Sequence, residues 1–331
     1  MIFHSFDRSR LAALASAALL ALPLSVLAQS DAKPVDVPAA PTQTEDATAG
    51  PSFPKPDPAD FSADSPTREQ VEGFLKANWG FDTKRLYQVQ SIAKTIVPGI
   101  STVKVLVGEK GNKQIGPLQF FALPDGKHII TAGEILPFSE HPFEENRTTL
   151  LKRADGPSRG AADKSLELVE FADFQCPHCK DAQATVEKLA TDFPNAHFVF
   201  QNFPLGQHPE AFRSAAYGLC VAKQGGDKAF FDYAAAVFDG QAGLATAEGA
   251  TLTLNSAVTK AGQSPDKVEA CSKTPETKAA VEANIKLAQD LGVNQTPMLA
   301  INGRLIPFAG INYDTLKQMI TWHAANDGAA K

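Results

Sequence analysis

The second half of the chain alternates strand-like and helix-like patterns of apolar residues. The run LELVEF (166–171) predicts a buried strand, and apolar residues then recur at helical spacing from Cys176 to about Ala190. A second strand-like run, HFVFQNF, covers 197–203. This order predicts a βαβ unit, because two strands joined by a crossover helix run parallel to each other.

The next stretch, about 205–291, reads almost entirely as helix. Two helix starts within it are marked by a hydroxyl residue before proline, at Ser264-Pro265 and Thr274-Pro275. The strand-like run MLAI (298–301), a turn at Asn302-Gly303, the run RLIPF and the helical pattern YDTLKQMITWHAA follow. We therefore predict an α/β domain over 164–331, in which a helical insertion precedes a closing hairpin and helix.

The region before this domain separates into a small domain and two connecting segments. Residues 65–139 carry one helix, introduced by Ser65-Pro66, and about four strands, of which LQFFAL and KHIITA form a hairpin. This pattern predicts a small α+β, cystatin-like domain. Residues 29–64 are rich in Pro, Ala, Asp and Thr and are predicted to be a disordered linker. Residues 140–163 read as a short helix and a connector.

The first 28 residues have the pattern of a cleaved secretory signal. Arg8 and Arg10 precede the apolar run LAALASAALLALPL, and Val26-Leu27-Ala28 suits a small-residue cleavage site. The alternative, an uncleaved membrane anchor, is disfavoured by Pro23 in a stretch already short for a spanning helix of about 20 apolar residues. We therefore expect a periplasmic or otherwise exported chain.

Charge excludes some classes of partner. The chain has 31 basic and 37 acidic residues, with no long block of like charge. A nucleic-acid or acidic-membrane partner is therefore not expected.

The candidate chemistry lies in the sequence Cys-Pro-His-Cys at the predicted start of a helix. A helix N-terminus stabilises a thiolate, so Cys176 and Cys179 are predicted to form a redox dithiol, with Cys176 as nucleophile and Cys179 as resolving thiol. Half of a zinc site has the same spacing. A metal-binding or chaperone module therefore remains an alternative, although zinc usually needs four convergent ligands.

The other two cysteines, Cys220 and Cys271, form a candidate structural disulfide. Disulfides persist in the oxidising compartments to which exported proteins go. The alternative is a pair of buried free thiols, which pack as small hydrophobic groups.

The order of elements around the dithiol resembles the thioredoxin fold and, more narrowly, the DsbA family of thiol:disulfide oxidoreductases, over roughly 164–326. The matching residues are Glu170, Cys176, Pro177, His178, Cys179, Thr296 and Pro297. Residues 65–139 are more weakly similar, through the PDGKHII hairpin, to the N-terminal dimerisation domain of the isomerases DsbC and DsbG. Those isomerases also have threonine before the cis-proline, where the best-known DsbA proteins have valine.

The resemblance implies roles for residues around the dithiol. Pro297 is expected to be a cis-proline that holds the Thr296 backbone beside Cys176, where an extended substrate can pair with it. Glu170 stands among Leu168, Val169 and Phe171, so we expect a buried carboxylate that moves protons near Cys179 rather than the alternative, a solvated strand residue. A donor from His178 is expected to favour the thiolate.

One further histidine, His208, precedes Pro209 and is expected to be a helix cap or a surface residue.

The leading hypothesis is therefore an exported oxidoreductase that forms disulfides in secreted proteins. The resemblance implies no bound cofactor, and a membrane re-oxidase of the DsbB or vitamin K epoxide reductase type. The alternative within the same chemistry is an isomerase or reductase that forms a homodimer through the domain at 65–139.

Overall fold

The computed structural model describes residues 50–327 and divides the chain into two compact units, Met1–Pro142 and Phe143–Lys331. The predicted secretory signal and residues 29–49 of the predicted linker lie outside the described residues. Each unit is described by itself.

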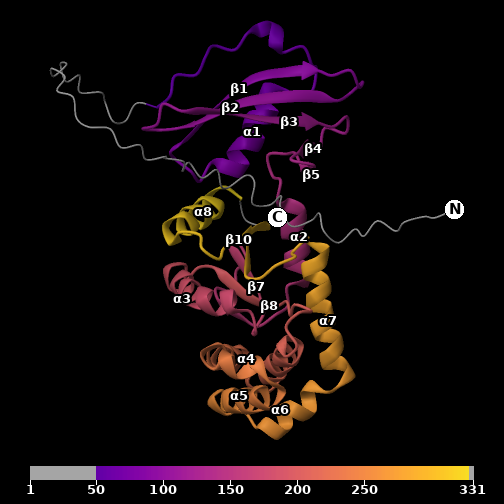
Figure 1. Ribbon diagram of the computed structural model, residues 1–331, viewed down its shortest axis with the longest axis vertical. Helices are drawn as coiled ribbons and strands as arrows, with labels where there is room; N and C mark the ends of the chain where they lie inside the picture. Colours follow the sequence, from indigo (N-terminus) through magenta and orange to yellow (C-terminus); the bar gives the residue numbers. More distant parts are fainter. Residues whose placement is uncertain (1–49, 328–331) are drawn as a thin grey trace, which may run out of the picture. The chain divides into compact units, whose positions relative to one another are not determined.

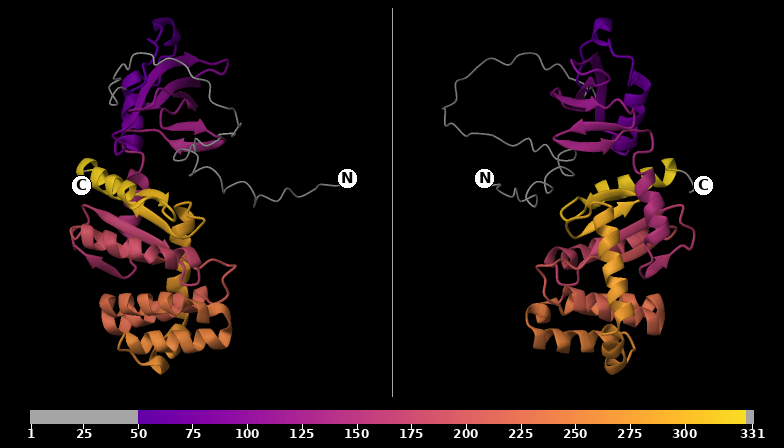
Figure 2. Two further views of the ribbon diagram at one scale, coloured as in Figure 1. Left: turned by 60° about the vertical axis from the view of Figure 1, so that its left-hand side comes forward. Right: turned by 90° about the vertical axis from the view of Figure 1, so that its right-hand side faces the viewer.

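The described part of the first unit is an antiparallel sheet with one α-helix on one face (Figures 1 and 2). Its elements are η2 (Pro58–Asp60), α1 (Arg68–Trp79), β1 (Arg85–Lys94), β2 (Ser101–Glu109), β3 (Ile115–Ala122), β4 (His128–Thr131) and β5 (Glu134–Pro137). The strands lie in sequence order, β1 to β5. The expected hairpin is present, since Ala122 pairs with Ile129 across β3 and β4.

Two expectations about the first unit were wrong. The helix covers REQVEGFLKANW, as predicted, but its N-cap is Thr67 rather than Ser65, because Thr67 and Gln70 form a capping box that satisfies the free N–H groups of the first turn. The segment 50–64 is not a disordered linker: Phe61 packs against the core of the unit, and the Ala63 N–H donates to the Ile92 carbonyl. Packing of Phe61 and Ala63 and hydrogen bonds to β1 therefore attach this largely polar segment to the unit.

The second unit has a mixed sheet between two layers of helices, extended by a helical insertion (Figure 1). Its elements are α2 (Glu144–Arg153), β6 (Ser158–Gly160), β7 (Glu167–Ala172), α3 (Pro177–Asp192), β8 (His197–Asn202), α4 (Ala211–Asp239), η3 (Gln241–Ala245), α5 (Ala247–Lys260), α6 (Pro265–Ser272), α7 (Pro275–Asp290), β9 (Met298–Ile301), β10 (Arg304–Pro307) and α8 (Tyr313–Asn326). The strand order is β10-β9-β7-β8-β6, and β7 pairs with β8 in parallel, as the βαβ pattern predicts. This is the expected thioredoxin fold.

The central strand β7 is buried on both faces, which is why its sequence is almost continuously apolar. Val169 and Phe171 face α2 and α7, where they join the cluster that contains Leu150 and Leu287. The alternate residues face α3, and one of them is Glu170. A carboxylate is thereby placed under the helix that carries the dithiol.

The predicted connector 140–163 belongs largely to the second unit. Residues 144–153 form α2, whose Leu150 is fully buried, and β6 pairs with β8 at the edge of the sheet. Because this segment is short and mostly polar, its sequence does not indicate that it packs against the sheet of the second unit.

The helical insertion is formed by α4 to α7. In both views of Figure 2 its first helices, α4 to α6, gather at one end of the second unit. Helix α4 bends at Gly226, whose φ of +76° is a conformation that glycine adopts readily. The aromatic cluster of Phe174, Phe230 and Tyr233 joins the insertion to the loop before α3. The insertion thus contributes one wall of the region around the dithiol.

Candidate functional site

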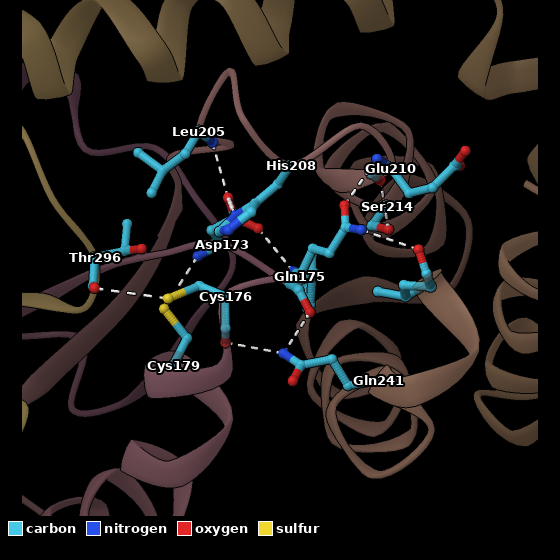
Figure 3. Close-up of polar contacts among 12 residues, drawn as sticks. Asp173, Gln175, Cys176, Cys179, Leu205, His208, Glu210, Ser214, Gln241 and Thr296 are labelled. Atoms are coloured by element: carbon cyan, nitrogen blue, oxygen red, sulfur yellow. Dashed lines mark hydrogen bonds and ion pairs between the residues drawn. The ribbon is translucent and has the colours of Figure 1, made fainter. Parts of the chain in front are cut away.

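The dithiol lies at the N-terminus of α3. Cys176 is the N-cap, with extended backbone angles, and Pro177 is the first helical residue, where proline removes no helical hydrogen bond. The Cys176 carbonyl accepts from the N–H groups of Cys179 and Lys180. Both cysteines are free thiols, and their sulfur atoms lie side by side (Figure 3). The positive end of the helix therefore points at Cys176.

The environment of Cys176 favours its thiolate. The Cys179 thiol beside it lowers the pKa of Cys176 to about 5, with help from Thr296 and from the N–H groups of Cys179 and His178, and against the effect of burial. The His178 contribution comes from its backbone, while its side chain is exposed. The expected donor from His178 is therefore a main-chain group.

Cys179 is in the opposite situation. It is fully buried, and burial raises the pKa of its thiol well above the ordinary value, to which the neighbouring Cys176 adds. The Asp173 N–H, 3.4 Å from Cys179 Sγ, works against this rise. The two thiols therefore differ greatly in acidity, which suits a nucleophile and a resolving group.

The Thr296-Pro297 peptide is cis, and Thr296 contacts the dithiol. The Cys176 thiol donates to the Thr296 carbonyl at 3.7 Å (Figure 3). The Thr296 hydroxyl is buried and has no hydrogen-bond partner among the described residues, so it is available to a sulfur anion. Residues 120 positions apart in the sequence thus meet at one sulfur atom.

Glu170 lies beneath α3 and is completely buried. Burial raises the pKa of Glu170 to about 7, although a hydrogen bond from Gln183 opposes the rise. The Gln183 amide donates to Glu170 Oε1 at 3.2 Å and to the Cys179 carbonyl at 3.0 Å. Gln183 thereby connects the carboxyl group to the residue that carries the resolving thiol.

A second buried carboxylate, Asp173, lies in the loop between β7 and α3. Its carboxylate accepts from the N–H groups of Gln175 and Leu205, and His208 Nδ1 lies 2.8 Å from Oδ2. His208 is therefore neither a cap nor simply a surface residue, as was expected, but a partner of the loop that precedes the dithiol.

Two glutamines join this loop to the helical insertion. The Gln241 amide donates to the carbonyls of Phe174 and Cys176, each at 2.9 Å. Gln175 donates to the Leu244 carbonyl and accepts from the Glu210 N–H (Figure 3). The insertion therefore holds the backbone of the loop as well as its side chains.

The second cysteine pair is a disulfide: Cys220 of α4 is joined to Cys271 of α6. The candidate pairing is thus present, and it lies within the helical insertion.

Within residues 50–327, no group of three or more His, Cys, Asp or Glu side chains is arranged to hold a metal ion. No helix in the same range is long and apolar enough to cross a membrane.

The structure brings together Glu170, Cys176, Pro177, Cys179, Thr296 and Pro297, and it leaves the His178 ring in solvent. Sequence reasoning missed Asp173, Gln175, Gln183 and Gln241, and it assigned His208 to a helix cap or the surface. Gln183 had a usable signal, since it follows Cys179 by one helical turn and so lies on the same helix face. The partners from the insertion had none, because their positions depend on how α4 and η3 pack.

Comparison with known proteins gives a match to one family model. Residues 152–321, just over half of the 331 residues, match the model described as Thioredoxin. The probable disulfide bond formation protein D of Bacillus anthracis is 30% identical over 171 residues, which are 49% of this chain and 76% of that protein.

Two further similarities are shorter or more distant. The Na(+)/H(+) antiporter NhaA 3 of Salinispora tropica is 35% identical over 68 residues, and the match spans 20% of this chain but only 10% of the antiporter's length. A solved structure of a periplasmic thioredoxin-like protein from Salmonella enterica serovar Typhimurium has a TM-score of 0.47 and 22% identity, and covers 55% of this chain and 97% of that one.

Proposed function

Because this chain belongs to the DsbA-like branch of the thioredoxin family, we propose that it is an exported thiol:disulfide oxidoreductase that forms disulfide bonds in secreted proteins. The observation that carries this proposal is the dithiol at the start of α3, where an acidic Cys176 and a buried Cys179 meet the Thr296-Pro297 loop.

The difference between the two thiols supports the proposed direction of electron flow. A thiolate stabilised at Cys176 lowers the free energy of the reduced enzyme, so the disulfide between Cys176 and Cys179 is a strong oxidant. A substrate thiolate attacks Cys176 Sγ, the enzyme disulfide breaks, and a mixed disulfide forms. A second substrate thiolate then attacks the substrate sulfur and releases Cys176 as a thiolate. The substrate has lost two electrons and the enzyme has gained them.

Other residues assist these steps. Glu170, with its pKa raised to about 7, accepts or returns the proton of Cys179. The Thr296 backbone, fixed by Pro297, pairs with an extended substrate beside Cys176. The substrates are reduced secreted proteins, no bound cofactor takes part, and a membrane re-oxidase of the DsbB or vitamin K epoxide reductase type restores the disulfide in the periplasm.

The test combines the reduction potential with the titration of Cys176. We expect the alkylation rate of Cys176 to follow a single ionisation with a midpoint near pH 5. Because this pKa is lower in the folded than in the unfolded chain, the contribution of Cys176 to the stability of the reduced protein falls by about 1.4 kcal/mol per pH unit as pH falls from about 9 to about 5. The difference in stability between the parent and Cys176→Ser isolates this contribution, because the raised pKa of Glu170 acts in the opposite direction below about pH 7. We also expect a potential well above that of thioredoxin, measured against glutathione. A strongly reducing potential with an ordinary midpoint near 9 contradicts the proposal.

A second candidate, a dimeric isomerase or reductase, is favoured by one feature of the first unit. Strand β5 is at the edge of the sheet, and 63% of Ile135 on it is exposed. An apolar residue on an open edge strand favours pairing with another chain. If this candidate is right, gel filtration will show a dimer that Ile135→Asp converts to a monomer. A monomeric parent chain contradicts it.

A further inference from the structure

One carboxylate, that of Asp173, joins the dithiol loop to two residues of the segment that leads into α4. Asp173 Oδ1 accepts from the Gln175 N–H at 2.7 Å, and Oδ2 accepts from the Leu205 N–H at 2.8 Å. The third partner is His208 Nδ1, also at 2.8 Å from Oδ2 (Figure 3). An ionised carboxylate only accepts hydrogen bonds, so Nδ1 is the donor in this contact. His208 is the one side chain among these donors.

The backbone of Asp173 contacts both cysteines. Its carbonyl accepts from the Cys176 N–H at 3.1 Å, and its N–H lies 3.4 Å from Cys179 Sγ. The orientation of this single residue therefore fixes a donor directed at the buried sulfur. Asp173 itself is 1% exposed, whereas the His208 side chain retains 21% exposure at the rim of the network.

The donor is directed at the atom that must carry charge during exchange. When a substrate thiolate attacks Cys176 Sγ, the bond between Cys176 and Cys179 breaks and Cys179 leaves with the electron pair, before it takes up a proton. Cys179 is fully buried, so water gives this anion little help. A fixed N–H directed at developing charge is an effective way to stabilise it.

We propose that His208 is a positioning residue for the departing Cys179 thiolate: its hydrogen bond to the Asp173 carboxylate fixes the Asp173 N–H that stabilises Cys179 Sγ in the transition state of disulfide exchange. The inference rests on the proposed function, because it requires the disulfide between Cys176 and Cys179 to form. It adds a residue from the segment that leads into α4 to the exchange reaction.

The proposal gives a kinetic signature. The same transition state is crossed when the enzyme disulfide opens and when it closes again, so loss of the donor slows both directions. Losing a hydrogen bond to a charged group in the transition state raises the barrier enough to slow the reaction about tenfold. In His208→Leu we therefore expect reduction by glutathione and re-closure of the mixed disulfide each to slow about tenfold, while the equilibrium constant with glutathione stays within about threefold. A general loss of stability would not produce this pattern.

Two amide variants and one control complete the experiment, which uses the full exported chain. In His208→Asn the amide nitrogen lies near the position of Nδ1, so the rates should return to within about threefold of the parent. In His208→Gln the amide lies near the position of Nε2, so this variant should be as slow as His208→Leu and keeps the test available if the leucine variant does not fold. His197 donates through Nδ1 to the Ala161 carbonyl at 2.9 Å, far along the strand from the dithiol, so His197→Leu should exchange at the parent rate.

The proposal is overturned if His208→Leu and His208→Gln exchange as fast as the parent, if His208→Asn is as slow as they are, or if His197→Leu is slowed equally. It is also overturned if the glutathione equilibrium moves while the opening rate does not. A parent chain that cannot form the disulfide between Cys176 and Cys179 overturns the proposed function together with this inference, whereas the other outcomes leave the proposed function intact.

Discussion

Replacing Cys176 by serine is expected to reduce the oxidation of protein thiols by about a thousandfold or more, because a hydroxyl can neither form the enzyme disulfide nor leave as a stabilised anion. Cys176 is the one cysteine with a lowered pKa, and it lies at the N-cap of α3 beside Thr296. The measurement is the rate at which the pre-oxidised protein converts a reduced dithiol peptide to its disulfide.

The partner variant Cys179→Ala is expected to give a different product. It retains the reactive Cys176 thiolate but has no thiol to displace a bound substrate, so Cys176 should accumulate as a mixed disulfide with glutathione or with a peptide. Mass spectrometry of the intact chain detects this adduct. In Cys176→Ser the buried Cys179 should form little of it, because burial keeps Cys179 in the thiol form.

The matched control is a chain in which the other cysteine pair is removed. Cys220→Ala with Cys271→Ala leaves Cys176 and Cys179 unchanged, so the peptide should still be oxidised at a temperature at which this chain is folded. Equal activity of the parent and Cys176→Ser, or an adduct at Cys179 rather than Cys176, would show that the assignment of the two thiols is wrong.

The elements around the dithiol were predictable because each has a strong local signal. The strand that became β7 is apolar at almost every position, and Pro177 marks the first turn of α3. Asn302 and Gly303 have positive φ, as the turn between β9 and β10 requires, and these two residue types adopt it most readily. The local sequence was sufficient to predict an element wherever neighbouring residues alone determine its backbone conformation.

The predictions for two segments were wrong because tertiary contacts hold these segments in place. Residues 50–64 have the composition of a linker, yet Phe61 finds an apolar surface on the first unit. The predicted connector contains one fully buried residue, Leu150, and that residue attaches α2 to the sheet. Composition averages over many residues, whereas one or two buried side chains decide whether a short segment is held.

The polar residues around the dithiol could not be predicted from the sequence for a related reason. Asp173 and His208 are 35 positions apart, and Gln241 reaches the Cys176 carbonyl across 65 positions. No periodicity relates such pairs, because their approach depends on how the insertion folds against the sheet. Residues carried over from the family's motif were easier to find, since their spacing within the motif is fixed.

The disulfide in the insertion should make a large contribution to stability that can be removed without touching the dithiol. Cys220 and Cys271 are 51 positions apart, and closing a loop of that length is expected to stabilise the folded chain by about 4 kcal/mol through the lost entropy of the unfolded state. We expect the double variant Cys220→Ala, Cys271→Ala to lose about this free energy of unfolding in urea, with both chains oxidised at Cys176 and Cys179.

A variant of Thr277 separates the cross-link from the local contacts around it. The Thr277 hydroxyl donates to the Cys271 carbonyl at 3.0 Å and lies 3.5 Å from Cys220 Sγ. Thr277→Val removes these contacts but keeps the disulfide, so it should cost only about 1 kcal/mol. If the double variant loses no more than Thr277→Val does, the cross-link contributes little, and packing between α4 and α6 must hold the insertion in place. If the loss is near the loop-closure value, the insertion depends on an oxidising compartment for the stability with which it supports the dithiol loop.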